Sequence, residues 1–314
     1  MYNFLDILGD IENITKIPFK IEYKNGRAFY QRKFEESKDR IVKTQIFINN
    51  ESFNLLINKD YEICASLLKY TIENKIREIK SKKEEILINL LSSKEVLEDD
   101  LYLNFPFLSG KAIIFLIHLE GSRYDALNII KELYREASAF VTIYGDDILL
   151  IKNSEDNKEH ADSIHDSITS ELYTDCSVSF GNEIDSYKEI KNCFDQAKRA
   201  QLYGDTFDVK SKIYSYSQLM LGNIAYNLSS EVKKEMLSII KHKLDKFDGE
   251  MLNTIEEFLK TDLNISEASK NLYVHRNTLI YRLDKIYKET GFDIRLFNQA
   301  SVFTIAYLVW KANR

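Results

Sequence analysis

The residues of this 314-residue chain best suited to chemistry form a polar and cationic set near its C-terminus. Each carries a group that can hydrogen-bond to a base edge or neutralise a phosphate: His275, Arg276, Asn277, Thr278, Tyr281, Arg282, Lys285 and Lys288. Arginine can donate two hydrogen bonds to guanine, asparagine can pair with adenine, and lysine neutralises phosphate. From Lys270 to Lys288 there are five basic residues and one acid, a local charge of +4, in a chain of net charge −6. We interpret this local excess as an electrostatic footprint for duplex DNA.

Two short helices are expected to present these groups, as a helix-turn-helix at about residues 264–288. Asn264 followed by Glu267 is an Asn variant of the capping box, in which each side chain satisfies a backbone N–H group of the other. Apolar residues recur along both helices at helical spacing. They are Ile265, Ala268 and Leu272 in the first, and Leu279, Leu283 and Ile286 in the second.

The joint between the two helices is Tyr273-Val274, with Val274 expected to fill the angle between them. His275 is expected to cap the second helix, with phosphate contact as a secondary role. Turning 100° per residue places Asn277, Tyr281 and Lys288 opposite the buried side. The competing interpretation is an ordinary amphipathic helical hairpin with a solvated polar face, which has the same periodicity.

Residues 251–312 resemble the C-terminal domain of the PucR/CdaR family of bacterial transcriptional regulators, whose helix-turn-helix is of the Fis type. The match rests on Leu272-Tyr273-Val274 and on His-Arg-Asn-Thr-Leu-Ile-Tyr-Arg-Leu at residues 275–283, followed by Lys285-Ile286 and Thr290-Gly291. The resemblance implies base and phosphate contacts from the matching residues Arg276, Asn277, Thr278, Tyr281 and Arg282.

Helices are also expected on both sides of this motif. Leu252, Ile255, Phe258 and Leu259 form an amphipathic pattern before it. Residues 297–310 form a strongly apolar pattern after it, which must pack on the hairpin or across a dimer interface, with Trp310 as the largest contributor of buried area. Polar residues interrupt this run, and it is shorter than the roughly 20 apolar residues of a membrane span.

Composition limits the rest of the chain. Its length suggests two or three domains, and a 44% hydrophobic content is enough for real cores. Three widely spaced cysteines, with no CxxC pair, indicate reduced thiols rather than disulfides or a metal site. The first residues lack the features of a signal peptide. We therefore expect a cytoplasmic protein without cofactor or metal.

The middle of the chain alternates strand and helix patterns. Strands are expected at residues 112–118, 139–143, 148–151 and 176–180, and helices at 124–135, 161–172 and 187–202. This order predicts an α/β sandwich with helices packed on a mostly antiparallel sheet.

This middle block is similar to the GGDEF-like domain that precedes the DNA-binding domain in the same family. Tyr144-Gly145-Asp146-Asp147-Ile148 occupies the signature hairpin, and residues 177–181 and 194–200 match a later strand and helix. The second glycine and the glutamate of a diguanylate cyclase are missing. Because a cyclase needs its glycine pair to approach the nucleotide and its carboxylates to hold Mg²⁺, activity does not carry over, and Asp146-Asp147 reads as turn chemistry.

The first hundred residues suggest a small antiparallel sheet of PAS- or GAF-like type. Asn25-Gly26 lies between strand-like runs at 17–23 and 28–34, and Asn49-Asn50 lies between runs at 41–48 and 52–57. A long helical segment follows from Tyr61, with isoleucines at 72, 79 and 86, seven residues apart. This spacing fits a dimer-forming helix or, equally, a helix packed on its own sheet.

Together these patterns predict a multidomain α+β protein. Its parts are an N-terminal sensory-like domain with a linker helix (1–100), a degenerate GGDEF-like domain (101–220) and a helical DNA-binding domain (221–314). We expect a DNA-binding regulator of PucR/CdaR type that reads a (pseudo)palindromic operator through the helix starting near Arg276. We expect a homodimer, modulated by an unknown effector, with no membrane partner and no enzymatic activity. The alternatives are a nucleotide- or cyclic-dinucleotide-binding GGDEF-like protein and a protein-binding scaffold with a helical C-terminal module.

Overall fold

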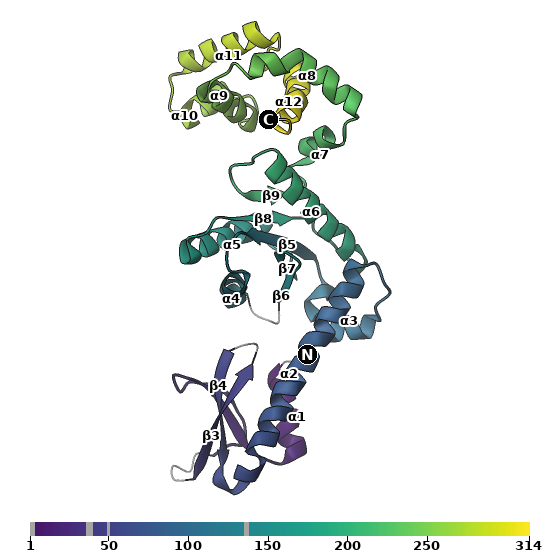
Figure 1. Cartoon of the computed structure of the whole chain (residues 1–314), viewed down its shortest axis with the longest axis vertical. Helices are drawn as coiled ribbons and strands as arrows, with labels where there is room; N and C mark the ends of the chain where they lie inside the picture. Colours follow the sequence, from purple (N-terminus) through teal and green to yellow (C-terminus); the bar gives the residue numbers. More distant parts are fainter. Residues whose placement is uncertain (1–3, 36–39, 49–50, 135–137) are drawn as a thin grey trace. The chain divides into compact units, whose positions relative to one another are not determined.

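The structure, a computed structural model, describes residues 4–35, 40–48, 51–134 and 138–314 (Figure 1). Contacts divide the chain into two units. The first consists of residues up to 112 together with 134–140 and 184–191, and the second consists of 113–133, 141–183 and 192–314.

The first unit contains a four-stranded antiparallel sheet. Its strands are β1 (Phe19–Tyr23), β2 (Ala28–Gln31), β3 (Ile41–Ile48) and β4 (Glu51–Asn58), in the order β2-β1-β4-β3. Gly26 has φ of +85°, a left-handed conformation that glycine adopts without strain. Both predicted hairpins are confirmed, while the tip of the second, at 49–50, lies outside the described residues.

Helices cover this sheet. They are α1 (Phe4–Thr15), the 3₁₀ turn η1 (Lys59–Cys64) and the long α2 (Ala65–Leu91). Leu8 of α1 and Leu68 and Ile72 of α2 share one core with the sheet. Ile86 is also buried, whereas Ile79 is only half-buried. Of the three isoleucines spaced seven residues apart, Ile72 thus packs on the sheet of its own unit. The unit continues with α3 (Glu98–Asn104) and η2 (Pro106–Ser109).

The second sheet has five strands in the order β6-β7-β5-β8-β9. They are β5 (Ala112–Leu119), β6 (Ala139–Tyr144), β7 (Asp147–Asn153), β8 (Cys176–Phe180) and β9 (Ile213–Ser215). The central strand β5 is buried except at His118, which explains its unbroken apolar run. The four predicted strands are confirmed. β9 was not predicted, and its pairing with β8 is parallel, whereas β5 and β8 pair antiparallel.

Each α-helix of the middle block buries one face, whereas the 3₁₀ turn η3 has no buried residue. The helices are α4 (Arg123–Leu133), α5 (Asn157–Leu172), η3 (Tyr187–Glu189) and α6 (Ile190–Thr206). Ile130 of α4, Ile164 of α5 and Ala197 of α6 are fully buried. The predicted helices are confirmed, although Arg135, the expected end of the first, lies outside the described residues. The fold is thus mixed α/β with a C-terminal helical region.

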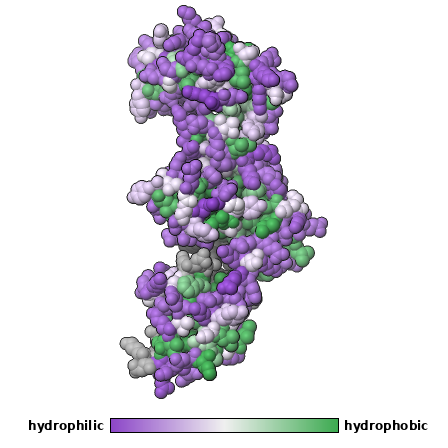
Figure 2. Space-filling model, in the orientation of Figure 1, coloured by the Kyte–Doolittle hydropathy of each residue, from purple (hydrophilic) through white to green (hydrophobic). Residues whose placement is uncertain are grey.

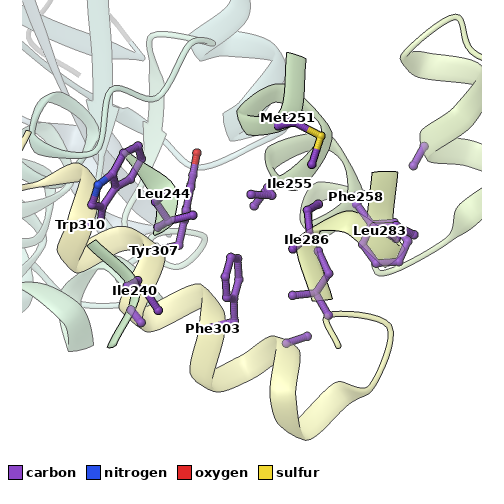
Figure 3. Close-up of a cluster of buried hydrophobic side chains, with 14 of the residues drawn as sticks. Ile240, Leu244, Met251, Ile255, Phe258, Leu283, Ile286, Phe303, Tyr307 and Trp310 are labelled. Carbon is purple, nitrogen blue, oxygen red and sulfur yellow. The ribbon is translucent and has the colours of Figure 1, made fainter. Parts of the chain in front are cut away.

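Six helices form that C-terminal region: α7 (Met220–Asn227), α8 (Ser230–Leu244), α9 (Gly249–Lys260), α10 (Ile265–Asn271), α11 (Arg276–Thr290) and α12 (Phe297–Lys311). Figure 3 shows Ile255, Ile286 and Phe303 pointing into one interior from α9, α11 and α12. Leu279 and Leu283 of α11 belong to the same cluster. The helices α9 to α12 were predicted, whereas α7 and α8 were not.

The closing helix α12 packs mainly on α7 and α8, and it reaches the predicted hairpin through the core that Phe303 shares with Ile286 of α11. Trp310 is 3% exposed, and its indole N–H donates to Oδ1 of Asp245 at 2.8 Å. The indole thereby ties α12 to the end of α8. Among the described residues, none of the helices has the length and apolar character needed to cross a bilayer.

Candidate nucleic-acid interface

The first helix of the motif begins at the expected cap. The side chain of Asn264 accepts hydrogen bonds from the backbone N–H groups of Ser266 (3.0 Å) and Glu267 (3.2 Å). The reciprocal half of the predicted capping box is wrong, because the Asn264 N–H donates to the carbonyl of Thr261 (2.9 Å). Asp262 and Leu263 have positive φ, and the Leu263 N–H donates to the carbonyl of Phe258 in α9 at 3.1 Å.

The turn between α10 and α11 contains Tyr273 and Val274, as predicted. Tyr273 has φ of +54° and is 96% exposed, and its N–H donates to the carbonyl of Lys270. The Val274 N–H donates to the carbonyl of Ser269, and its side chain packs against the domain core. Val274 therefore fills the angle between the helices, as expected.

His275 caps the second helix, which confirms that prediction. Its Nδ1 accepts a hydrogen bond from the backbone N–H of Asn277 at 3.2 Å. The helix ends at Gly291, whose φ of +82° is the left-handed conformation common after a helix C-terminus. Between these ends, Leu279, Leu283 and Ile286 are buried, so the expected inner face is also confirmed.

The opposite face of α11 is exposed, and we call it the reading face. Seven of its members carry DNA-binding chemistry and are exposed to solvent: His275, Arg276, Asn277, Thr278, Tyr281, Lys285 and Lys288. The exposed Asp284 lies on the same face. Tyr281, for example, is 69% exposed. Figure 2 shows a largely hydrophilic surface over the C-terminal helices. Within the described part of the chain, Arg276, Lys285 and Lys288 form no ion pair, so their charges remain available to a ligand.

Arg282 differs from the other predicted site residues. Its Nη2 donates to Oε2 of Glu250 (2.8 Å) and its Nη1 to Oγ1 of the buried Thr254 (3.1 Å). The Arg282 side chain is only 18% exposed. Its guanidinium thus ties α11 to the first turns of α9, and only the family resemblance assigns it a DNA contact. Glu250, 32 residues away, had no signal in the sequence.

A second ion pair involves the one acid of the segment 270–288. Asp284 accepts a hydrogen bond from Nη1 of Arg295 at 2.7 Å, and Arg295 also binds Asp293 through Nε (2.7 Å) and Nη2 (3.0 Å). The side-chain hydrogen bond from Arg295 holds the pKa of Asp293 below its ordinary value. With Arg282 and Asp284 both paired, four unpaired cations remain in this segment of the described chain: Lys270, Arg276, Lys285 and Lys288.

A polar cluster around Glu256 supports the helices behind the reading face. Its Oε1 accepts hydrogen bonds from the Tyr307 hydroxyl (3.1 Å) and from Nζ of Lys311 (2.8 Å). Its Oε2 lies 3.4 Å from Nζ of Lys210. Burial raises the pKa of Glu256, but the hydrogen bonds and the positive charges outweigh it, so the pKa lies below the ordinary value. This cluster fixes α9 against α12.

The two acids of the middle-block turn are also paired. Asp147 lies 2.8 Å from Nδ1 of His118, and Nη1 of Arg123 donates to Asp146 and to the carbonyl of Gly145, both at 3.0 Å. The described residues include no group of three or more histidines, cysteines or acids arranged to hold a metal. The hydrogen bonds of Arg123 to Gly145 and Asp146 fasten this turn to the start of α4.

Comparison with known proteins gives one family and several relatives. Residues 251–309 match the protein-family model described as the PucR C-terminal helix-turn-helix domain. The chain is 22% identical over 282 residues to the proline-responsive transcriptional activator PutR of Bacillus subtilis, a match that covers 80% of this chain and 66% of PutR. It is 30% identical over 139 residues to the DNA-binding transcriptional activator AdeR of Bacillus subtilis (42% of this chain, 32% of AdeR).

A third relative is the carbohydrate diacid regulator of Escherichia coli, 28% identical over 131 residues (41% of this chain, 34% of that protein). Across these three relatives, the chain matches between 32% and 66% of their length.

Proposed function

We propose, from the chain's membership of the PucR/CdaR family of transcriptional regulators, that it is a DNA-binding regulator that reads its operator through α11. The observation that carries this proposal is the division of α11 into two faces. One face buries Leu279, Leu283 and Ile286, and the other leaves seven side chains with DNA-binding chemistry in solvent. That division is what a helix needs in order to enter the major groove while staying attached to its domain.

The positions along α11 suggest different roles. Arg276 and Asn277, in the first turn, have the bidentate groups that recognise guanine and adenine. Thr278 and Tyr281 supply hydroxyl and apolar contacts, while Lys285 and Lys288 neutralise phosphates. His275 caps the helix at the end that approaches the bases, with a phosphate contact as a further role. Arg282 positions α11 through α9, and any contact of its own with DNA is secondary to that role.

A single reading helix covers only a few base pairs, which favours a homodimer. Two half-sites about one helical turn, ~34 Å, apart would match a pseudopalindromic operator. We propose that the segments upstream of residue 221, a PAS- or GAF-like domain (1–100) and a GGDEF-like domain (101–220), set the spacing of the two reading helices. The name of one relative records a response to proline, and the name of another refers to carbohydrate diacids. A small metabolite that shifts the population of binding-competent dimers would fit this pattern, in the cytoplasm where the chromosome lies.

The test separates base reading from phosphate binding. The full-length chain first selects its preferred duplex from a random-sequence library, and affinity is then measured on that duplex and on random DNA at several salt concentrations. Arg276→Ala is expected to cost about 1–3 kcal/mol on the selected duplex and to relax preference at one base. Lys285→Ala is expected to weaken both duplexes similarly and to reduce the salt slope by about one.

The matched control is Lys234→Ala, which removes an exposed lysine of α8 that is not a member of the reading face. It is expected to leave both affinities unchanged. Equal losses on selected and random DNA for both Arg276→Ala and Lys285→Ala would contradict this assignment of base reading to Arg276 and phosphate binding to Lys285.

A further inference from the structure

Asp284 lies on the reading face, among the groups that would approach DNA. At 100° per residue it falls about 20° from Asn277 and about 40° from Lys288 around the axis of α11. Its side chain is 58% exposed. A carboxylate in this position is unfavourable, because the DNA backbone carries a dense negative charge.

Arg295 forms an ion pair with that carboxylate from outside the helix. Its Nη1 lies 2.7 Å from Oδ1 of Asp284. The remaining donors Nε and Nη2 bind both carboxylate oxygens of Asp293, and the Arg295 backbone N–H donates to Oδ1 of Asp293 at 3.2 Å. With its other donors occupied on Asp293, the guanidinium has one nitrogen aimed at α11.

The loop that carries Arg295 is fixed by α12. The backbone N–H of Asp293 donates to Oε1 of Gln299 at 2.7 Å, and Ile294 between the two charged residues is buried in the domain core. The Asp293 side chain is 20% exposed, compared with 58% for Asp284. The two acids that share Arg295 therefore differ in position, one on the reading face and one set back in the loop.

We infer that Arg295 is a positioning residue for DNA reading, which pairs with the Asp284 carboxylate and offsets part of its charge on the reading face of α11. This inference rests on the proposed function. Without the arginine, the carboxylate would offset one of the nearby cations Lys285 and Lys288, and the repulsion of phosphate would weaken binding to every sequence. The effect is electrostatic, so salt should screen it.

The experiment measures the affinity of the full-length chain and its variants for the duplex selected as above, at low and high salt. Arg295→Gln is expected to bind roughly tenfold more weakly at low salt, the order expected for one uncompensated charge near a phosphate, with a smaller loss at high salt. Asp284→Asn is expected to bind at least as tightly as the wild type. The double variant, Arg295→Gln with Asp284→Asn, is expected to recover the affinity of Asp284→Asn, because the carboxylate that needed neutralising is gone.

A control separates charge compensation from loss of structure. Asp293→Asn weakens the anchor of Arg295 but keeps the Asp284–Arg295 pair, so it is expected to lower thermal stability while preserving DNA affinity. Arg295→Lys, which keeps the charge, is expected to retain most of the affinity and covers the case in which Arg295→Gln fails to fold.

Three results would overturn the inference. They are wild-type affinity in a folded Arg295→Gln variant, a double variant as weak as Arg295→Gln alone, and a loss of affinity in Arg295→Lys as large as in Arg295→Gln. If the wild-type chain selects no duplex at all, the proposed function fails instead.

Discussion

Replacing Arg282 by methionine tests whether this arginine holds the reading helix or contacts DNA. Methionine keeps much of the length and apolar stem of arginine but removes the guanidinium that binds Glu250 and Thr254. The family resemblance implies a DNA contact, while the structure gives the guanidinium two partners on α9. The two roles predict different outcomes for stability and for binding.

The magnitude follows from the exposure of the two partners. Glu250 is 77% exposed, so its ion pair is screened by solvent and contributes about 0.5 kcal/mol. Thr254 is fully buried, and a hydrogen bond from a charged donor contributes about 1.5 kcal/mol. Hydrogen bonds to charged groups contribute about 1.5–3 kcal/mol. We take the lower end of this range because the Thr254 hydroxyl keeps its own hydrogen bond to the carbonyl of Glu250 at 2.7 Å. Arg282→Met should therefore lower the free energy of unfolding by about 2 kcal/mol.

Urea denaturation followed by tryptophan fluorescence measures this change. Trp310 is the only tryptophan of the chain and is buried in the same core as α11, so its emission reports on this domain. Glu250→Gln is the matched variant, expected to cost only about 0.5 kcal/mol because it alters the exposed end alone.

DNA affinity then distinguishes the two roles. Glu250→Gln releases the charge of Arg282 from its acidic partner, so a DNA-contacting Arg282 would bind the selected duplex more tightly in this variant. A positioning Arg282 leaves the affinity unchanged. A loss of affinity in Arg282→Met with no loss of stability would refute our reasoning.

Three further predictions concern the core, the pH dependence and the cysteines. Phe303→Ala empties a fully buried position in the domain core and should destabilise the domain by about 3–5 kcal/mol in the same urea assay, whereas a cost below about 1 kcal/mol would contradict the packing in Figure 3. The pKa of Glu256 is lowered in the folded state, so its contribution is present above the ordinary value of 4.5 and is lost as the pH falls through the lower folded value. Glu256→Gln should therefore reduce stability at neutral pH and flatten its decline in acid, and an unchanged pH profile would count against the cluster with Lys311. Burial raises the pKa of Cys176 to about 11, so mass spectrometry after iodoacetamide treatment at neutral pH should find half-buried Cys64 modified and Cys176 unmodified until the chain unfolds.

Much of the fold could be predicted because its signals are local. Apolar runs bounded by turn residues were enough for eight of the nine described strands. The strand that was missed, β9, has three residues, too few to form a pattern, and it depends on its pairing with β8. The helices α1, α3, α7 and α8 were not predicted. α3 and α7 are short, with seven and eight residues. α8 has a charged, weakly patterned sequence whose buried residues Ile240 and Leu244 come at its end.

The reading face was also within reach of the sequence, because the periodicity of one helix decides which of its side chains share a side. Leu279, Leu283 and Ile286 are buried as their spacing predicted, and the cap at His275 involves residues only two positions apart. Such relations depend on the geometry of a single turn, which is the same in every α-helix.

Only the tertiary structure decided which charges of that helix are already paired. Arg282 meets Glu250 from 32 residues earlier, and Asp284 meets Arg295 from the loop before α12. The same limit applies at shorter range to Glu267. Its side chain was predicted to accept a hydrogen bond from the Asn264 N–H, but that N–H donates to the carbonyl of Thr261 in the preceding turn. The sequence determined the faces of α11 because helical periodicity is a local property. The partners of its charges depend on how α9, α11 and α12 pack, and residue spacing within one helix carries no record of that packing.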